Sequence, residues 1–231
     1  AVLSGPGGAW QRLLAAVITR SGERTGLAGG PPAAGGGPSA AAAERQFGVR
    51  VPRGFAKRIR PSDPGDPILR QLLPVAAEDE PVEGFSDDPV GELAAARGGG
   101  VLQKYHGRAL VVVTPVCAVH CRYCFRRHFP YAEHGTAAAG WQAAVDRIAA
   151  DPGINEVILS GGDPLTLSDE RLGELAGSLA TLPTVRRLRL HTRLPIVLPE
   201  RVDRSLVSWL SALEVPLVVV VHANHANEID A

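Results

Sequence analysis

Residues 109–124 read ALVVVTPVCAVHCRYC, an apolar and β-branched run that leads into three cysteines, Cys117, Cys121 and Cys124. The chain has no other cysteine. Their spacing, with three residues in the first gap and two in the second, lacks the two paired spacings of most structural zinc sites. Three thiolates can instead hold a four-iron cluster and leave one iron open, and an open position is where a metal site does chemistry. The stretch therefore predicts a buried strand that leads into an iron–sulfur site.

Other interpretations of the cysteines stay open at this point. Structural zinc could complete its four ligands with His120 or His128, or the cysteines could be unrelated buried residues. A disulfide framework is disfavoured because the number of cysteines is odd and the chain is too large to need cross-links. Reduced thiols indicate the cytoplasm as the compartment.

Composition limits the expected partners. The 231 residues are 45% hydrophobic, enough to bury a substantial core. Lysine plus arginine and aspartate plus glutamate both number 24, so no net charge attracts nucleic acid or an anionic membrane. No apolar stretch reaches the ~18 residues that span a bilayer, and no signal peptide is legible. We expect a cytoplasmic protein without nucleic-acid or membrane partners.

The chain divides near residue 100. Residues 1–100 are predicted to form a helical and extended N-terminal appendage, with an amphipathic helix at 11–20, a Gly/Ala/Pro-rich linker at 26–43, short proline-broken helices at 50–73 and an acidic, then glycine-rich strap at 78–100. Residues 101–231 are predicted to form the core domain. Because they stop after a strand and a polar loop, without a closing helix, we expect this core to be truncated at its C-terminus.

Strand-like and helix-like patterns alternate beyond residue 100. Runs that suit buried parallel strands lie at 109–114, 156–160, 186–191 and 216–222. Apolar residues with helical spacing lie between them, namely Trp141, Val145 and Ile148, then Leu172, Leu175, Leu179 and Leu182 behind a Ser168 N-cap, then Val202, Leu206, Leu210 and Leu213. Repeated strand–helix units predict an α/β fold with a parallel sheet, either open or closed into a barrel.

A polar or glycine-rich motif follows each predicted strand. The motifs are the three cysteines, SGGDP at 160–164, HTRLP at 191–195 and HANHANE at 222–228. The loops after parallel strands meet at one edge of the sheet, so we expect the four motifs to line one rim. One Gly-Gly-Asp turn alone would be weak support, because such turns are common. Four motifs at successive strand ends predict an active site.

The ordered motifs resemble the radical S-adenosylmethionine (SAM) enzymes, and among them the lysine 2,3-aminomutase family. The resemblance is carried by KYHGR at 104–108, the segment 117–131, SGGDPL at 160–165, HTRLPIVLP at 191–199 and HANHANEID at 222–230. Within the family, RVPRGF at 50–55, RYCFRRHFPY at 122–131 and Ala226 resemble the branch that makes (R)-β-lysine for modification of translation elongation factor P.

The resemblance implies a (β/α)6-type radical SAM barrel, of which four of six strands are legible. It also implies conversion of L-lysine to (R)-β-lysine with a 4Fe–4S cluster, SAM and pyridoxal 5'-phosphate (PLP). Breaking an unactivated C–H bond is beyond side-chain acids and bases, so such a reaction needs cofactors. The family's PLP-bearing lysine has no counterpart here, since neither Lys57 nor Lys104 occupies a matching position. We therefore expect this chain alone to be inactive in isomerisation.

Site residues follow from the resemblance and from side-chain chemistry. The expected iron ligands are Cys117, Cys121 and Cys124. The expected contacts are Gly161, Gly162 and Asp163 with the methionine part of SAM, Arg108 with the PLP phosphate, Arg126 with the lysine carboxylate, and His191, Arg193, His222 and Asn224 with SAM or PLP. A turn for the glycines, a surface charge for Arg108 or Arg126, and a packing role for each of the others are the alternatives.

Partners and competing functions follow from the same motifs. The expected partners are free L-lysine, an electron donor such as flavodoxin or ferredoxin and, indirectly, the ligase that modifies elongation factor P; a homo-oligomer is a further option. A related lysine or glutamate 2,3-aminomutase of amino-acid metabolism is the first alternative function. A non-catalytic metal-binding module is an alternative of another class.

Overall fold

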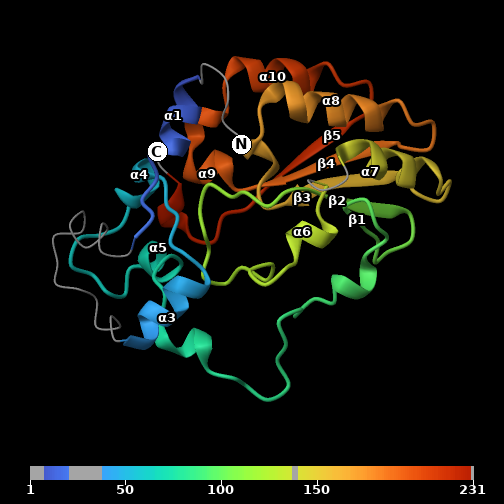
Figure 1. Ribbon diagram of the computed structural model, residues 1–231. Helices are drawn as coiled ribbons and strands as arrows, with labels where there is room; N and C mark the ends of the chain where they lie inside the picture. The colour runs from blue at the N-terminus through green and yellow to red at the C-terminus, as the bar shows by residue number, and fades with distance from the viewer. Residues whose placement is uncertain (1–7, 21–37, 137–139, 230–231) are drawn as a thin grey trace.

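The computed structural model describes residues 8–20, 38–136 and 140–229, which form an α/β fold around one sheet (Figure 1). The described strands are β1 (Val101–Leu102), β2 (Arg108–Thr114), β3 (Glu156–Gly161), β4 (Arg187–Thr192) and β5 (Leu217–Val221), in that order across the sheet. Strands β2 to β5 are parallel, and β1 pairs antiparallel with β2. The predicted α/β class and the four parallel strands are confirmed, and the described sheet is open. Strand β1 was missed because two residues show no periodicity.

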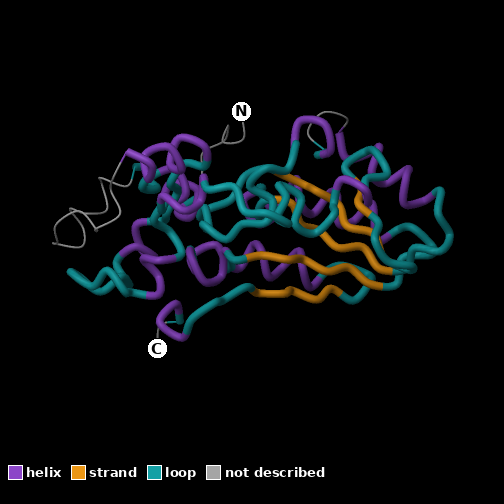
Figure 2. Tube along the Cα trace, turned by 90° about the horizontal axis from the view of Figure 1, so that it is seen from below, coloured by secondary structure: helices purple, strands orange, loops and turns teal. Residues whose placement is uncertain are grey.

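The described helices are α1 (Ala9–Ala15), α3 (Pro38–Gln46), α4 (Arg53–Ala56), α5 (Pro67–Arg70), α6 (Tyr131–His134), α7 (Gly140–Ala149), α8 (Asp169–Ala180), α9 (Leu194–Val197) and α10 (Arg204–Ser211). Helices α7, α8 and α10 lie along one face of the sheet, as Figure 1 shows, and Figure 2 shows the strands from below. They are the three helices that the apolar stripes predict. The polar motifs follow the carboxyl ends of the parallel strands, at one edge of the sheet.

Side-chain caps set where these helices begin. The Ser168 hydroxyl accepts a hydrogen bond from the backbone N–H of Arg171 at 3.4 Å, as predicted for the start of α8. Helix α10 begins later than its apolar stripe suggests, because Asp203 accepts from the backbone N–H of Leu206 at 2.9 Å and caps it. Val202 therefore lies outside the helix and is 49% exposed. The helical position predicted for Val202 is wrong.

The N-terminal segments pack on the same hydrophobic core as the strands. Trp10, Leu14 and Ile18 belong to one buried cluster with residues of β2, β3 and β4. Helix α1 begins and ends earlier than the predicted helix over 11–20, and Ile18 forms an antiparallel bridge with Val51. Of the predicted linker at 26–43, residues 26–37 lie outside the described residues, and 38–43 belong to α3. The boundary near residue 100 stays a prediction.

Strand β5 lies at one edge of the described sheet and is only partly covered. Its valines Val218, Val219 and Val221 are each roughly 40% exposed, whereas Val157 of β3 and Leu190 of β4 are fully buried. An apolar edge strand leaves both its side chains and its backbone groups available for pairing.

Over the described parts of the chain, no helix combines the length and the apolar character needed to cross a membrane.

The ion pairs of Glu156, at the start of β3, predict that part of the free energy of unfolding depends on pH. Its carboxylate lies 2.9 Å from Arg189, 3.2 Å from Arg187 and 3.3 Å from Arg108. Burial acts to raise the pKa of Glu156, but hydrogen bonding from Arg189 and the charges of Arg189 and Arg108 hold it below its ordinary value. Because the folded pKa is the lower one, the ionised carboxylate stabilises the fold above the unfolded pKa. That contribution is lost as the pH falls through the folded pKa.

We expect Glu156→Gln to lower the free energy of unfolding by about 1–2 kcal/mol at pH 7, and by clearly less below the ordinary glutamate pKa of ~4.3, where the stabilisation from the wild-type charge is being lost. Urea denaturation of both proteins at the two pH values measures the difference. An equal loss at both pH values would contradict the assigned role of charge.

Candidate functional site

The three cysteines lie in the loop that leaves the carboxyl end of β2 after Thr114. Cys117, Cys121 and Cys124 are partly buried and form no disulfide. Burial raises the pKa of Cys117, and the negative charges of Asp163 and of the other two cysteines raise it further. The thiols are therefore close enough to oppose one another's ionisation. A positively charged metal site is what such a set of thiolates needs in order to deprotonate.

The two histidines that could complete a zinc site have other contacts. His120 directs Nδ1 to the Gly48 carbonyl at 2.7 Å and stacks on Phe47, and His128 lies 3.7 Å from Asp87. Within residues 8–20, 38–136 and 140–229, no group of three or more His, Cys, Asp or Glu side chains converges on one ion-binding point. The three thiols of this loop have the chemistry of the protein ligands of a four-iron cluster, in which each thiolate binds a different iron.

The Gly-Gly-Asp turn lies directly against the start of the cysteine loop. Gly161 has a φ of +117°, and a Cβ there would lie 2.7 Å from the Thr114 carbonyl oxygen. A Cβ on Gly162 would collide with the Val116 carbonyl, and the Gly162 N–H donates to the Thr114 carbonyl at 2.6 Å. Both glycines are therefore needed for close backbone approach within the protein. Their predicted contact with SAM stays a prediction.

Asp163 faces into the protein. Its buried carboxylate accepts from the Thr192 hydroxyl at 2.7 Å and from the backbone N–H groups of Arg193 at 2.7 Å, Leu165 at 3.1 Å and Leu194 at 3.2 Å. Burial raises the pKa of Asp163, and these hydrogen bonds act against that rise. The carboxylate thus joins the end of β3 to the end of β4. An approach of SAM to this turn would use its backbone, because the carboxylate is already engaged.

Arg126 is a buried site residue and not a surface charge, since it is only 7% exposed. Its guanidinium makes a two-pronged ion pair with Glu92, at 2.7 Å from Nε and 2.6 Å from Nη2. Its Nη1 donates to the Ser160 hydroxyl at 3.0 Å and to the Gly161 carbonyl at 3.1 Å. Glu92 comes from the strap at 78–100 and holds the two-pronged position predicted for a substrate carboxylate. Among the described residues, four of the five N–H donors of Arg126 have a partner and one has none.

The structure brings His191 to this rim but not Arg108. Burial, followed by the charges of Arg189 and Arg126, lowers the pKa of His191, which keeps the imidazole neutral at pH 7. Arg108 stands at the first residue of β2, and its half-exposed side chain pairs with Glu156. Parallel strands have their amino ends at the opposite edge from their carboxyl ends, so Arg108 lies away from the cysteines. The structure thus offers no geometric support for its predicted contact with the PLP phosphate.

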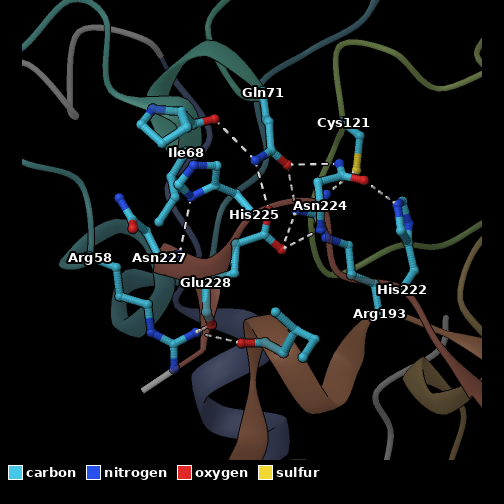
Figure 3. A network of polar contacts seen from close by, with 12 residues as sticks. Arg58, Ile68, Gln71, Cys121, Arg193, His222, Asn224, His225, Asn227 and Glu228 are labelled. Atoms are coloured by element: carbon cyan, nitrogen blue, oxygen red, sulfur yellow. Dashed lines mark hydrogen bonds and ion pairs between the residues drawn. The ribbon is translucent and has the colours of Figure 1, made fainter. Parts of the chain in front are cut away.

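Arg193, which follows β4, reaches the cysteine loop through a buried polar network (Figure 3). Its Nη1 donates to the Cys121 sulfur at 2.8 Å and also to the Tyr123 hydroxyl. Its Nη2 donates to Gln71 Oε1 at 2.6 Å and lies 3.0 Å from Glu228 Oε2. Within the described part of the chain, the buried Nε of Arg193 has no hydrogen-bond partner. A group bound at this rim could supply that missing acceptor.

The HANHANE motif completes the network from the end of β5. The Asn224 side-chain amide donates to Gln71 Oε1 at 3.0 Å and to the Tyr123 hydroxyl. His222 Nε2 lies 2.7 Å from Asn224 Oδ1, and its ring meets Tyr123 edge-on at 6.0 Å between centroids. His222 and Asn224 are thus brought to the same rim as Arg193, as predicted. Their contact with SAM or PLP stays a prediction.

Two residues of the site, Gln71 and Glu92, lie outside every predicted motif, and Glu228 ends the predicted HANHANE motif but had no role assigned to it. Gln71 follows α5, a helix of one turn that Asp66 caps by accepting from the N–H groups of Ile68 and Leu69. Glu92 and Glu228 stand in acidic or polar loops without regular spacing. No periodicity marks any of the three, because each is defined by its partner from a distant segment.

Comparison with known proteins identifies the class. Residues 111–217 match the model of the Radical SAM superfamily, and this span holds the end of β2, the cysteine loop and strands β3 and β4. The chain belongs to that superfamily, whose domain implies a 4Fe–4S cluster and SAM.

The relatives define the family more narrowly. The chain is 46% identical over 189 residues to the L-lysine 2,3-aminomutase of Escherichia coli (strain K12), with 82% of this chain and 55% of that protein covered. It is 44% identical over 189 residues to that of Haemophilus influenzae, with 82% and 56% covered, and 35% identical over 176 residues to that of Clostridium subterminale, with 76% and 42% covered. The chain is thus a member of the lysine 2,3-aminomutase family. It spans about half the length of these curated relatives.

Proposed function

We propose that the chain is the cluster-binding and SAM-binding part of an aminomutase that converts L-lysine to (R)-β-lysine. The observation that carries the proposal is the loop of three thiols at the carboxyl end of β2, beside the buried Arg126 and the Gly-Gly-Asp turn. When bound, the cluster and SAM supply the radical that abstracts an unactivated hydrogen, which no side chain can do. Cys117, Cys121 and Cys124 hold the cluster in this proposal.

Arg126 is the residue proposed to recognise the substrate carboxylate. A guanidinium that is buried and always charged suits a carboxylate better than the ammonium group of a lysine side chain would. With Glu92 in place, Arg126 has one N–H left for a second carboxylate, so a substrate would either share the arginine or displace Glu92. The Ser160 hydroxyl and the Gly161 carbonyl keep the guanidinium plane fixed in either case.

The wider proposal concerns the whole protein. Its relatives are about twice as long as the matched segment, and PLP and the lysine that carries it belong to the whole protein. We assign its product to modification of elongation factor P because 50–55, 122–131 and Ala226 resemble that branch. A flavodoxin or ferredoxin as electron donor, free L-lysine as substrate and a cytoplasmic setting complete the proposal.

The test is anaerobic reconstitution of the whole protein that contains this chain, with iron, sulfide, SAM, PLP and a reductant. We expect L-lysine to be converted to β-lysine, with the R configuration by chiral chromatography. Conversion of glutamate instead would favour the related mutase. A colourless protein with one bound zinc and no cleavage of SAM would contradict the proposal and favour a non-catalytic metal-binding module.

A further inference from the structure

The contact between Arg193 and Cys121 is short and buried. The Nη1–Sγ distance is 2.8 Å, and Arg193 is only 5% exposed. The guanidinium also lies over the rings of Phe55 and Tyr123, at 5.6 Å and 5.9 Å from their centroids. A buried charge of this kind is screened little by salt and acts strongly on its neighbours.

We infer that Arg193 raises the reduction potential of the cluster by donating a hydrogen bond, and presenting its positive charge, to the Cys121 thiolate. The inference rests on the proposed cluster site but not on the aminomutase reaction. Reduction adds one electron to the cluster. A positive charge and a hydrogen bond at a ligand sulfur favour the more negative, reduced form, and both are known determinants of cluster potentials.

Glu228 and Gln71 act as positioning residues for this guanidinium. Glu228 Oε2 lies 3.0 Å from Nη2, on the side away from Cys121, and Gln71 Oε1 accepts from the same nitrogen at 2.6 Å. The Gln71 amide also donates to Glu228 Oε1 at 2.7 Å (Figure 3). This hydrogen bond fixes the Gln71 and Glu228 side chains relative to each other. Glu228 has a second effect, because its negative charge partly cancels that of Arg193 at the sulfur. Loss of Glu228 and loss of Arg193 should therefore shift the potential in opposite directions.

The arginines of the cysteine loop itself are directed elsewhere. Arg122 and Arg127 both pair with Glu78, and Arg126 pairs with Glu92. Each of these charges has a carboxylate partner from residues 78–92. Arg193 differs because its guanidinium contacts the sulfur of a proposed iron ligand directly.

The test is a redox titration of the chain, reconstituted anaerobically with iron and sulfide and followed by electron paramagnetic resonance without SAM. We expect Arg193→Gln to lower the ratio of reduced to oxidised cluster about tenfold at a fixed applied potential, equivalent to ~59 mV for one electron. We expect Glu228→Gln to raise that ratio. Arg187→Gln is the matched control, since Arg187 starts the same strand at its other end and is half-exposed. It should leave the ratio unchanged.

The outcomes separate this inference from the proposed function. A wild-type chain without a cluster would overturn the proposed site itself. Clusters with wild-type potentials in both Arg193→Gln and Glu228→Gln would overturn the inference alone. If Arg193 only bound SAM, the potentials measured without SAM would be unchanged, and that result would count against the inference. If Arg193→Gln assembles no cluster, Glu228→Gln decides, since an unchanged potential there overturns the inference and a raised one supports it.

Discussion

Replacing Cys124 by alanine should abolish the cluster, taking the iron content of the anaerobically reconstituted chain from about four per chain to near zero. The three thiolates are the protein ligands that the loop offers, and two of them leave a second iron without a ligand. Cys124 is partly buried, and this burial raises its pKa, so the site holds a thiolate there only when a metal stabilises it. Iron and sulfide assays with the visible absorption spectrum measure the loss.

His128→Ala is the matched control for this variant. His128 lies four residues beyond Cys124, pairs with the exposed Asp87 and was one candidate for the fourth ligand of a zinc site. We expect His128→Ala to keep the full cluster. Loss of metal in both variants, with zinc as the metal bound by the wild type, would replace the cluster by a structural zinc site.

Replacing Asp163 by alanine should destabilise the chain by about 3–5 kcal/mol. The substitution leaves four donors without an acceptor at the junction of β3 and β4, namely the Thr192 hydroxyl and the N–H groups of Leu165, Arg193 and Leu194. Buried donors without partners each cost free energy because water cannot replace the lost acceptor. The free energy of unfolding, from anaerobic urea denaturation of the apo-protein, measures the effect.

Two further variants sharpen that result. Glu174→Ala removes an exposed carboxylate from α8 and should change stability by less than about 0.5 kcal/mol. Asp163→Asn keeps the size of the side chain but replaces an acceptor oxygen by an amide, so it should also destabilise. A near-neutral Asp163→Ala would mean that the carboxylate serves a ligand and not the fold.

The parallel strands could be predicted to within one or two residues because each carries a run or an alternation of apolar residues before a polar motif. Residues 109–113 form a continuous apolar run, and the structure places β2 there. Helix α1 was placed less well, because Ile18 continues the apolar pattern but pairs with Val51 as a β-bridge. Tertiary pairing of this kind overrides helical spacing and leaves no mark in the local sequence.

The motifs that form the site could be predicted from the sequence, but many of the hydrogen bonds between them could not. The cysteine spacing and the motifs at strand ends identified which loops meet. Asp163 was expected at SAM, yet the backbone N–H groups of Arg193 and Leu194 bind one of its oxygens, and the Thr192 hydroxyl and the Leu165 N–H bind the other. Gln71 and Glu228 are 157 positions apart, and their contact exists only after the sheet has formed. Contacts of that range cannot be read from spacing.

The order of the strands has a consequence for biosynthesis. Each of β2 to β5 pairs with the strand that precedes it in the chain, so the sheet can grow by one edge at a time as the ribosome delivers it. The cysteine loop emerges early in this sequence, whereas Glu228, which secures Arg193, emerges more than a hundred residues later. The three thiols are therefore synthesised well before Glu228 can position the Arg193 guanidinium beside Cys121. Iron delivered after residue 228 has emerged meets a finished site, and iron delivered sooner meets three cysteines on a growing chain.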